Sequence, residues 1–161
     1  MNLQMTGVLR RAALLLAPLA AVAVPLPAFA QAQTTTTHFS GTVSEPDTNP
    51  CTGAAGTITE TFHGVTHVTG LPDGTGHETT TLTGTFTFVP DDPSQSALAG
   101  KFTIFDGENF NQQNTTATAI SVFLARGTDG SRADAHLVFH ITVNPDGAVT
   151  VTVEKPTLSC R

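Results

Sequence analysis

Apolar and polar residues alternate along most of the chain after residue 31, and no stretch there repeats apolar residues at helical spacing. Segments that alternate in this way, are rich in Thr, Val, Ile and Phe, and are bounded by Gly, Pro, Asp or Asn are typical of β-strands with one buried face. Their even spacing and short loops favour an antiparallel meander. The pattern predicts seven strands, near 37–45, 56–69, 76–89, 98–106, 115–126, 134–143 and 148–155.

Residue size sets the register of the hairpin between the second and third strands. Pairing Phe62 with Gly84 also pairs Leu82 with Gly64, so each large side chain lies opposite a glycine that it can cover. In this register the even-numbered positions of both strands form one apolar face. We expect that face to point into a dry interior.

The last hairpin turns at residues 144–147, whose sequence is Asn-Pro-Asp-Gly. Asn at the first position, Pro at the second and Gly at the fourth suit a type I turn with a left-handed glycine. A turn at this place pairs Val143 with Val149 and continues the apolar face across the last two strands.

Residues 1–30 have the three-part layout of an export signal. Two arginines precede an apolar run, and the small-residue motif Ala-Phe-Ala at 28–30 offers a cleavage site. The apolar run is too short and too interrupted by proline for a membrane span of about 20 residues. We therefore expect a secreted, extracytoplasmic protein that begins at Gln31 or Gln33 and forms a single domain, 31–161.

The charge of the chain excludes two classes of partner. Cleavage removes two of the 7 Lys and Arg residues and none of the 13 Asp and Glu residues, which gives the mature chain a net charge of −8 with His neutral. Binding to nucleic acid or to an anionic membrane depends on clustered Lys and Arg, and the five that remain are scattered singly. Neither partner is expected.

Cys51 and Cys160 are the only cysteines, and an oxidising compartment favours a disulfide between them. In a seven-stranded meander, the loop before the second strand and the end of the seventh strand lie at the same end of the sheet. A bridge there would bring the last strand towards the first or second and curl the sheet towards closure, which hides its edges. The predicted fold is therefore an all-β barrel of about seven strands, with a two-sheet β-sandwich as the alternative.

The interior of such a barrel is the predicted binding site. Barrels of about eight strands are either filled by side chains or leave room for one small ligand. No cofactor is expected. The predicted lining comes from the second to the sixth strand and consists of Phe62, Phe86, Phe88, Phe102, Ile120, Val122, Phe139 and Ile141.

Glu60 is the candidate for acid–base chemistry. By parity with Phe62 it lies on the apolar face, with Phe86 as its register partner. A carboxylate in an apolar interior has a raised pKa and can act as an acid or a base. The alternative is a solvated Glu60 near a rim or at a bulge. The sequence contains none of the familiar catalytic motifs.

Two histidines form the candidate metal site. The register above places His67 diagonal to His77 on the polar face, within reach of one metal ion if a third ligand joins them. Histidines four residues apart on a strand, such as His63 and His67, are separated by about 13 Å and cannot share an ion. The alternative is that His and Thr cover the polar face of a half-buried sheet.

The segment 106–114 is predicted to form a loop between the fourth and fifth strands. Its sequence, Asp-Gly-Glu-Asn-Phe-Asn-Gln-Gln-Asn, offers oxygen ligands and an aromatic ring that suit Ca²⁺ or a sugar. The spacing does not match an EF-hand loop, and Asn, Gly and Asp are also ordinary turn residues.

Several short motifs span most of the mature chain: Asn-Pro-Cys-Thr-Gly at 49–53, Lys-Phe-Thr-Ile-Phe-Asp-Gly at 101–107, Arg-Gly-Thr-Asp-Gly-Ser at 126–131, Val-Asn-Pro-Asp-Gly at 143–147 and Leu-Ser-Cys at 158–160. In these motifs the chain resembles a group of small exported bacterial proteins that have no assigned function. The resemblance implies an export signal, the cysteine pair and a β-rich fold, and it transfers no catalytic or binding residue. In layout alone, the chain is also similar to lipocalin-like and allene-oxide-cyclase-like barrels.

Three functions are compatible with these features. The first is a non-enzymatic exported β-barrel that binds a small apolar ligand, or a partner through its loops. The second is a cofactor-free cyclase, isomerase or hydrolase in which Glu60 is the acid–base. The third is a structural or adhesive surface protein, which the Thr-rich outer face permits.

Overall fold

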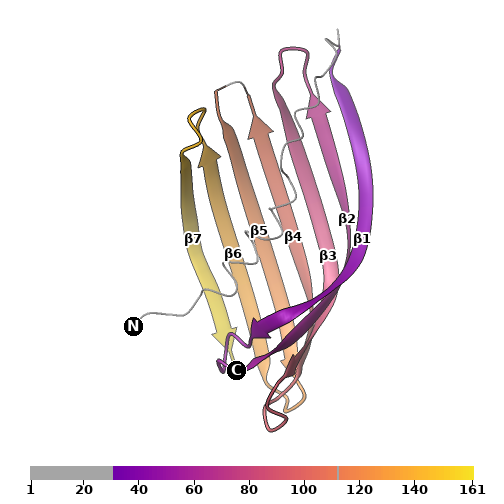
Figure 1. The fold of residues 1–161 in the computed structure, drawn as a ribbon, viewed down its shortest axis with the longest axis vertical. Helices are drawn as coiled ribbons and strands as arrows, with labels where there is room; N and C mark the ends of the chain where they lie inside the picture. Colours follow the sequence, from indigo (N-terminus) through magenta and orange to yellow (C-terminus); the bar gives the residue numbers. More distant parts are fainter. Residues whose placement is uncertain (1–30, 112) are drawn as a thin grey trace.

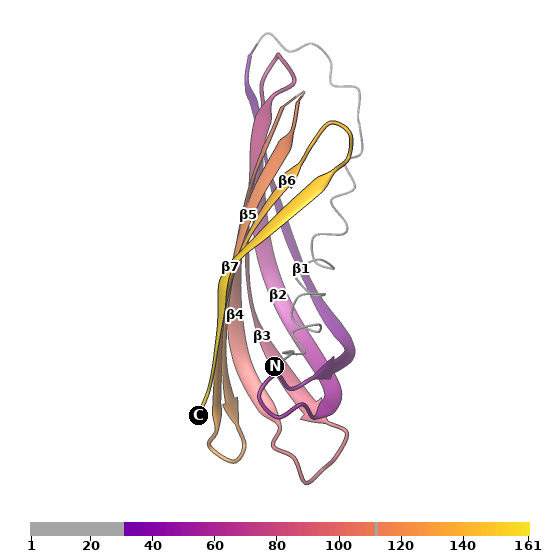
Figure 2. The same ribbon diagram turned by 90° about the vertical axis from the view of Figure 1, so that its left-hand side faces the viewer.

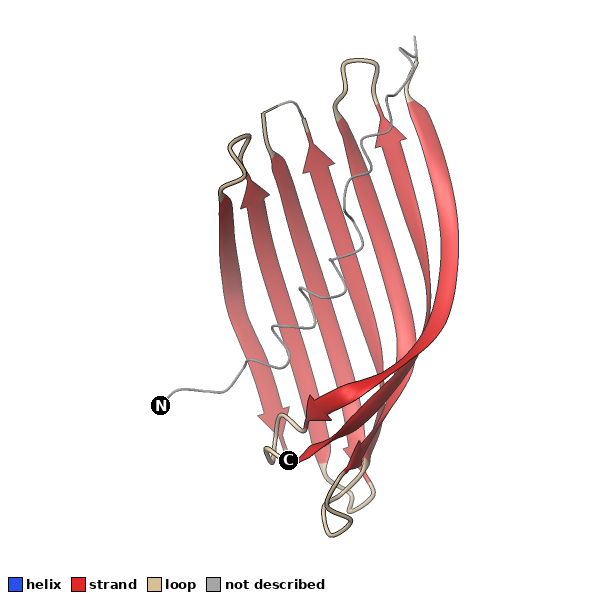
Figure 3. Cartoon of the chain, in the orientation of Figure 1, coloured by secondary structure: helices blue, strands red, loops and turns tan. Residues whose placement is uncertain are grey.

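A single antiparallel sheet makes up the fold (Figure 1), and Figure 3 shows strands and loops throughout the coloured part of the chain. The structure, a computed structural model, describes residues 31–111 and 113–161, so the predicted export signal at 1–30 lies outside the described residues. The strands are β1 (Gln33–Thr48), β2 (Ala55–Gly70), β3 (Gly76–Pro90), β4 (Leu98–Phe110), β5 (Thr115–Gly127), β6 (Arg132–Val143) and β7 (Val149–Cys160). Each strand pairs with the next, which confirms the predicted seven-stranded antiparallel meander. In the described part of the chain, no helix is long and apolar enough to cross a membrane.

The sheet is not closed. β1 and β7 are its two edges and do not pair with each other, and Figure 2 shows the sheet as one curved and twisted layer. The predicted barrel is therefore wrong, and so is the two-sheet sandwich, since all seven strands belong to one sheet. The physical reason is that the disulfide attaches the end of β7 to the loop after β1, so it never requires the two edge strands to meet.

The connection between β1 and β2 crosses the concave face at the end where β7 finishes (Figure 1). Cys51 in this connection and Cys160 in β7 form the predicted disulfide, with 5.8 Å between their Cα atoms. We call residues 47–51, which are the last two residues of β1 and the first three of this connection, the strap. Within it Asn49 is buried, and its Oδ1 accepts hydrogen bonds from the backbone N–H groups of Cys51 and Thr52. The strap is thus a short, internally bonded connection that is covalently anchored and covers one end of the concave face.

The predicted turn at 144–147 is confirmed. Gly147 has a left-handed backbone conformation, with a φ of 79°, and its N–H donates a 2.9 Å hydrogen bond to the carbonyl oxygen of Asn144. Val143 pairs with Val149, as the sequence pattern predicts.

Phenylalanine rings on the concave face lie over glycines of neighbouring strands. The predicted pairing of Phe62 with Gly84 is confirmed, but Phe62 does not cover that glycine. Phe62 instead lies over Gly41, its register partner in β1, and Gly84 is covered by Phe102 of β4. A Cβ atom added at Gly84 would lie 2.7 Å from Cζ of Phe102, so this glycine leaves the space that the ring occupies.

The exchange of rings and glycines is reciprocal within two strand pairs. Phe39 of β1 lies over Gly64 of β2, whereas the sequence pattern predicts that Leu82 covers this glycine. In the β3–β4 pair, Phe86 lies over Gly100 in the same way. The large side chains therefore bind β1 to β2 and β3 to β4, and each ring gains a contact with backbone that any other residue than glycine would block.

Gly84→Ala is expected to lower the free energy of unfolding by about 1–3 kcal/mol, because the new methyl group would overlap Phe102 and the backbone carbonyl oxygen of Thr61. Gly70→Ala is the matched control. Nothing lies within 4 Å of a Cβ atom at Gly70, so that variant should be as stable as the wild type or up to about 1 kcal/mol more stable. Urea unfolding followed by circular dichroism measures both, and equal stability of the two variants would contradict this packing.

Removing the disulfide is expected to lower the free energy of unfolding by about 5 kcal/mol. This is the value that loop-closure entropy assigns to a bond between residues 109 apart in the sequence. Urea titrations of the oxidised protein, the reduced protein and Cys51→Ser/Cys160→Ser test it. A loss below about 1 kcal/mol would show that the strap stays on the sheet without its covalent anchor.

Candidate functional site

The concave face of the sheet carries the apolar core in two clusters, and Phe123 packs against both. The ring of Phe123 stacks on Phe102, with 5.7 Å between the centroids, and makes an edge contact with Phe86. These contacts join the clusters into one continuous apolar surface. The cluster near the strap contains Ile58, Leu82, Phe86, Phe88, Leu98, Phe102, Ala125 and Ala133, and the second contains Ala119, Leu137 and Phe139.

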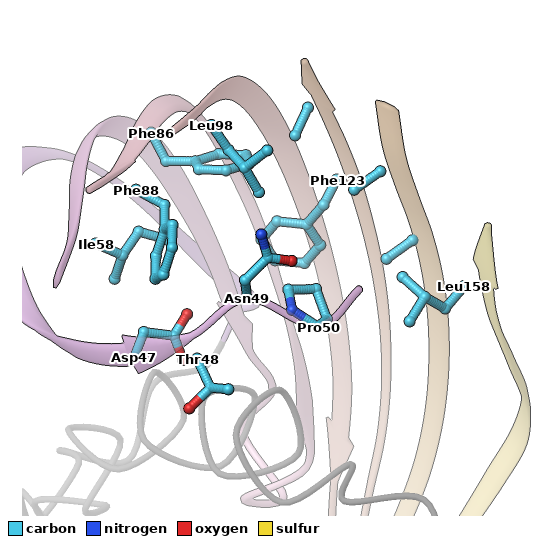
Figure 4. A pocket seen from close by; sticks show the side chains of 13 residues that line it. Asp47, Thr48, Asn49, Pro50, Ile58, Phe86, Phe88, Leu98, Phe123 and Leu158 are labelled. Atoms are coloured by element: carbon cyan, nitrogen blue, oxygen red, sulfur yellow. The ribbon is translucent and has the colours of Figure 1, made fainter. Parts of the chain in front are cut away.

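A cavity of about 80 Å³ lies between the strap and the sheet (Figure 4). Asn49 and Pro50 bound it on the strap side, and Leu158 of β7 also lines it. The space exists because β5 and β6 present small side chains here, namely Ala125, Ala133 and Ala135. The rest of the sheet side is apolar and consists of Ile58, Phe86, Phe88, Leu98 and Phe123.

The concave face holds six of the eight residues predicted to line a ligand site. Ile120 and Val122 are the exceptions and lie on the convex face, where they pair with Phe105 and Thr103. The prediction is wrong for these two residues because β5 is apolar on both faces, and its concave positions, apart from Phe123, carry small side chains that do not mark the buried face in the sequence. The six on the concave face are Phe62, Phe86, Phe88, Phe102, Phe139 and Ile141, of which Phe86 and Phe88 line the cavity.

Glu60 lies where the sequence pattern places it. It is on the concave face between Ile58 and Phe62, its register partner is Phe86, and its exposed fraction is 8%. It is not among the residues that line the cavity. Its burial is therefore confirmed, and its catalytic role stays a prediction.

A second group of acids lies on the concave face towards the end away from the strap. Glu78 of β3 is the register partner of Glu108 of β4, and Asp106 lies two residues before Glu108 on the same face. We call these three residues the carboxylate cluster. Next to them the hydroxyl of Thr80 donates a 3.4 Å hydrogen bond to Glu78 and shares a 2.7 Å hydrogen bond with Thr66. Like charges directly opposite each other on neighbouring strands repel. The cluster therefore lowers the stability of the fold, and folding does not require it.

Asp106 is the most buried member of the cluster. Its exposed fraction is 6%, and its Oδ1 has no hydrogen-bond partner among the described residues. Burial, together with the nearby carboxylate of Glu78, raises the pKa of Asp106. Burial also raises the pKa of Glu108, and the charges of Glu78 and Asp106 add to the effect. Carboxyl groups shifted by burial and by a neighbouring charge are typical of functional sites.

The segment 106–114 is not the loop that the sequence pattern predicts. β4 continues to Phe110, and the turn is confined to 111–114. The error arises because Asp106 and Glu108 interrupt the apolar alternation that marks the rest of β4. Their even numbers, which they share with the buried residues of that strand, are the signal that could have placed them on the concave face.

The histidines lie on the convex face. His67 is diagonal to His77 as predicted, and its Nδ1 makes a 2.9 Å hydrogen bond with the hydroxyl of Thr36. His63 and His140 are also hydrogen-bonded to threonine hydroxyls. Within residues 31–111 and 113–161, no group of three or more His, Cys, Asp or Glu side chains is placed to hold a metal ion. These contacts are those of a polar sheet face covered by His and Thr.

The fold is expected to become more stable as the pH falls from neutral. Because the pKa values of Asp106 and Glu108 are raised in the folded state, that state binds protons more readily than the unfolded chain. The gain begins as the pH falls through the raised values and is complete near the ordinary values of 3.8 for Asp and 4.5 for Glu. Asp106→Asn should raise the thermal midpoint at pH 7 and flatten its pH dependence above pH 4.5. Thermal melts at a series of pH values measure this, and an unchanged profile in the variant would contradict the assignment.

Comparison of the chain with protein-family models, with curated proteins and with solved structures found no match. The features from which a function can be inferred are therefore those of the molecule itself: the apolar concave face, the cavity beneath the strap and the carboxylate cluster.

Proposed function

We propose that this protein is an exported, non-enzymatic binding protein that holds a small apolar ligand on the concave face of its sheet, with part of the ligand in the cavity beneath the strap. The observation that carries this proposal is the cavity of about 80 Å³ and its apolar lining. Ligand sites in proteins are concave and mostly apolar, with a few polar groups that fix orientation. Asp47 and Asn49 of the strap are such polar groups at the edge of this cavity.

The apolar surface next to the cavity supports the proposal. Phe62, Ile104 and Phe123 pack against the buried cluster but are only partly buried themselves. All seven strands belong to one sheet, and the described part of the chain has no second layer that covers these side chains. Contiguous apolar surface of this kind usually marks an interaction site, and an apolar ligand would cover it.

Export is supported by two features. Structural disulfides persist in oxidising compartments, and the bond between Cys51 and Cys160 anchors the strap over the cavity. The sequence of residues 1–30 has the layout of an export signal. A bond that shapes the binding site would therefore form only where the protein is delivered.

The test uses the neutral apolar dye N-phenyl-1-naphthylamine, whose fluorescence increases in an apolar site. The wild type should bind it saturably. Ala135→Leu should weaken binding about tenfold, since the larger side chain fills the cavity and removes roughly 1.4 kcal/mol of contact. Ala99→Leu is the matched control, because Ala99 is exposed on the convex face of β4. Its dye affinity should equal that of the wild type.

Native mass spectrometry of the refolded protein, incubated with a mixture of apolar compounds, gives a second measurement. Recovery of a bound compound from the wild type and from Ala99→Leu, but not from Ala135→Leu, is the expected result. No saturable dye binding and no recovered compound would overturn the proposed function.

A further inference from the structure

We propose that the ligand is a cationic amphiphile, a molecule with one apolar chain and a protonated amine at its end, whose chain lies on the concave face and whose ammonium group binds the carboxylate cluster of Glu78, Asp106 and Glu108. This inference rests on the proposed function and adds the chemical class of the ligand.

The cavity and the carboxylate cluster lie on one face, at opposite ends of a continuous apolar surface. The even-numbered residues of β4 show the order along the strand. Leu98 lines the cavity, Phe102 and Ile104 follow in the apolar middle, and Asp106 and Glu108 come last. The face therefore has an apolar end and an anionic end, as a site for an amphiphile requires.

The distance between the two ends suits a single apolar chain. Asp106 lies four residues beyond Phe102, whose register partner Phe123 lines the cavity, and four residues of strand span about 13 Å. Leu98 is eight residues away, which corresponds to about 26 Å. The apolar chains of one membrane leaflet span about 15 Å, half the hydrocarbon core of a bilayer. A chain of that length reaches from the cluster to the cavity.

Asp106 supplies an acceptor that the protein itself does not use. The side chain is more than nine-tenths buried, and its Oδ1 has no partner among the described residues. Buried polar atoms in proteins are nearly always hydrogen-bonded, so an unpaired one indicates a missing partner. An ammonium group carries several N–H donors and forms charge-assisted bonds, so it can bind this oxygen and the carboxylate of Glu78 or Glu108 together.

The cluster is not neutralised by the cationic side chains that the structure describes. Lys101, Arg126 and Arg132 lie on the convex face. The guanidinium of Arg161 is bonded to Asp134, also on that face, at 2.9 Å. The anionic end of the concave face is therefore complementary to a positive charge from outside the chain.

An organic ammonium fits the cluster better than a metal ion. Ca²⁺ requires six to eight oxygen ligands around one point. Among the described residues, no three acidic or His side chains are grouped closely enough to hold a metal ion, the carboxylate cluster included. An ammonium group needs only one or two carboxylates at hydrogen-bond distance, and its apolar chain adds binding energy along the rest of the face.

The experiment compares three compounds that share one apolar chain: dodecylamine, 1-dodecanol and dodecanoate. The affinity of the wild-type protein for each compound is measured by displacement of the naphthylamine dye, at concentrations below micelle formation. The amine, which is protonated at pH 7, should bind about tenfold more tightly than the alcohol, and dodecanoate should bind more weakly than either.

The decisive variant is Glu78→Gln/Glu108→Gln, in which the affinity for the amine should fall most of the way to that for the alcohol, since only Asp106 keeps its charge, while the alcohol binds as before. The matched control is Asp91→Asn/Asp92→Asn, which removes the same charge from the β3–β4 loop at the other end of the sheet. It should keep the tenfold preference. Should the double Gln variant not fold, the comparison of the three compounds on the wild type decides alone.

Equal affinity of the wild type for the amine and the alcohol would overturn this inference and leave the proposed function intact. An equal loss of preference in the control and in the double Gln variant would also overturn it, because net charge rather than the cluster would then be responsible. If neither the dye nor any of the three compounds binds, the proposed function fails, and this inference fails with it.

Discussion

Residues 31–111 and 113–161 form one layer of sheet, with no second layer among them to bury its apolar face, and this constraint explains most of the described structure. The phenylalanine rings lie over glycines of adjacent strands, which brings them into contact with the sheet itself. At one end the strap takes the place of a second layer, and the bond between Cys51 and Cys160 keeps it there. Away from the strap the same face stays partly open. A face covered at one end only leaves apolar side chains such as Phe62 and Ile104 partly exposed, and the binding site that we propose includes them.

The two ends of the concave face differ in chemical character. Near the strap its side chains are apolar and bounded by a cavity, and towards the other end it carries Glu78, Asp106 and Glu108. The described cations lie on the opposite face, so they do not offset this charge. In the complex that we propose, apolar contact and charge act on different parts of the ligand, and the distance between the two ends sets the length of the ligand that can use both.

Residue size explains which parts of the fold the sequence could predict. The alternation and the pairing of Phe62 with Gly84 were sufficient for the β2–β3 register, because a slip by one residue would turn the apolar face towards solvent. Closure was not predictable, since strand parity places the two cysteines at the same end of the sheet in a closed or an open meander. Ile120 and Val122 were misplaced for a related reason: in a strand that is apolar on both faces, alternation no longer distinguishes one face from the other.

The sequence pattern did not predict the buried position of the carboxylate cluster, and the same property that hid it makes the cluster informative about function. Strand prediction relies on apolar alternation, and Asp106 breaks it at a position that the structure buries. A chain selected for stability alone would place an apolar residue there, as it does at Phe102 on the same strand. Residues that contradict the local sequence rules for a stable strand usually occur where function compensates the loss of stability. Glu60 breaks the same rule in the apolar middle of the face, whereas Asp106 does so beside two further acids, and our proposal that the ligand is selected by its charge rests on that combination.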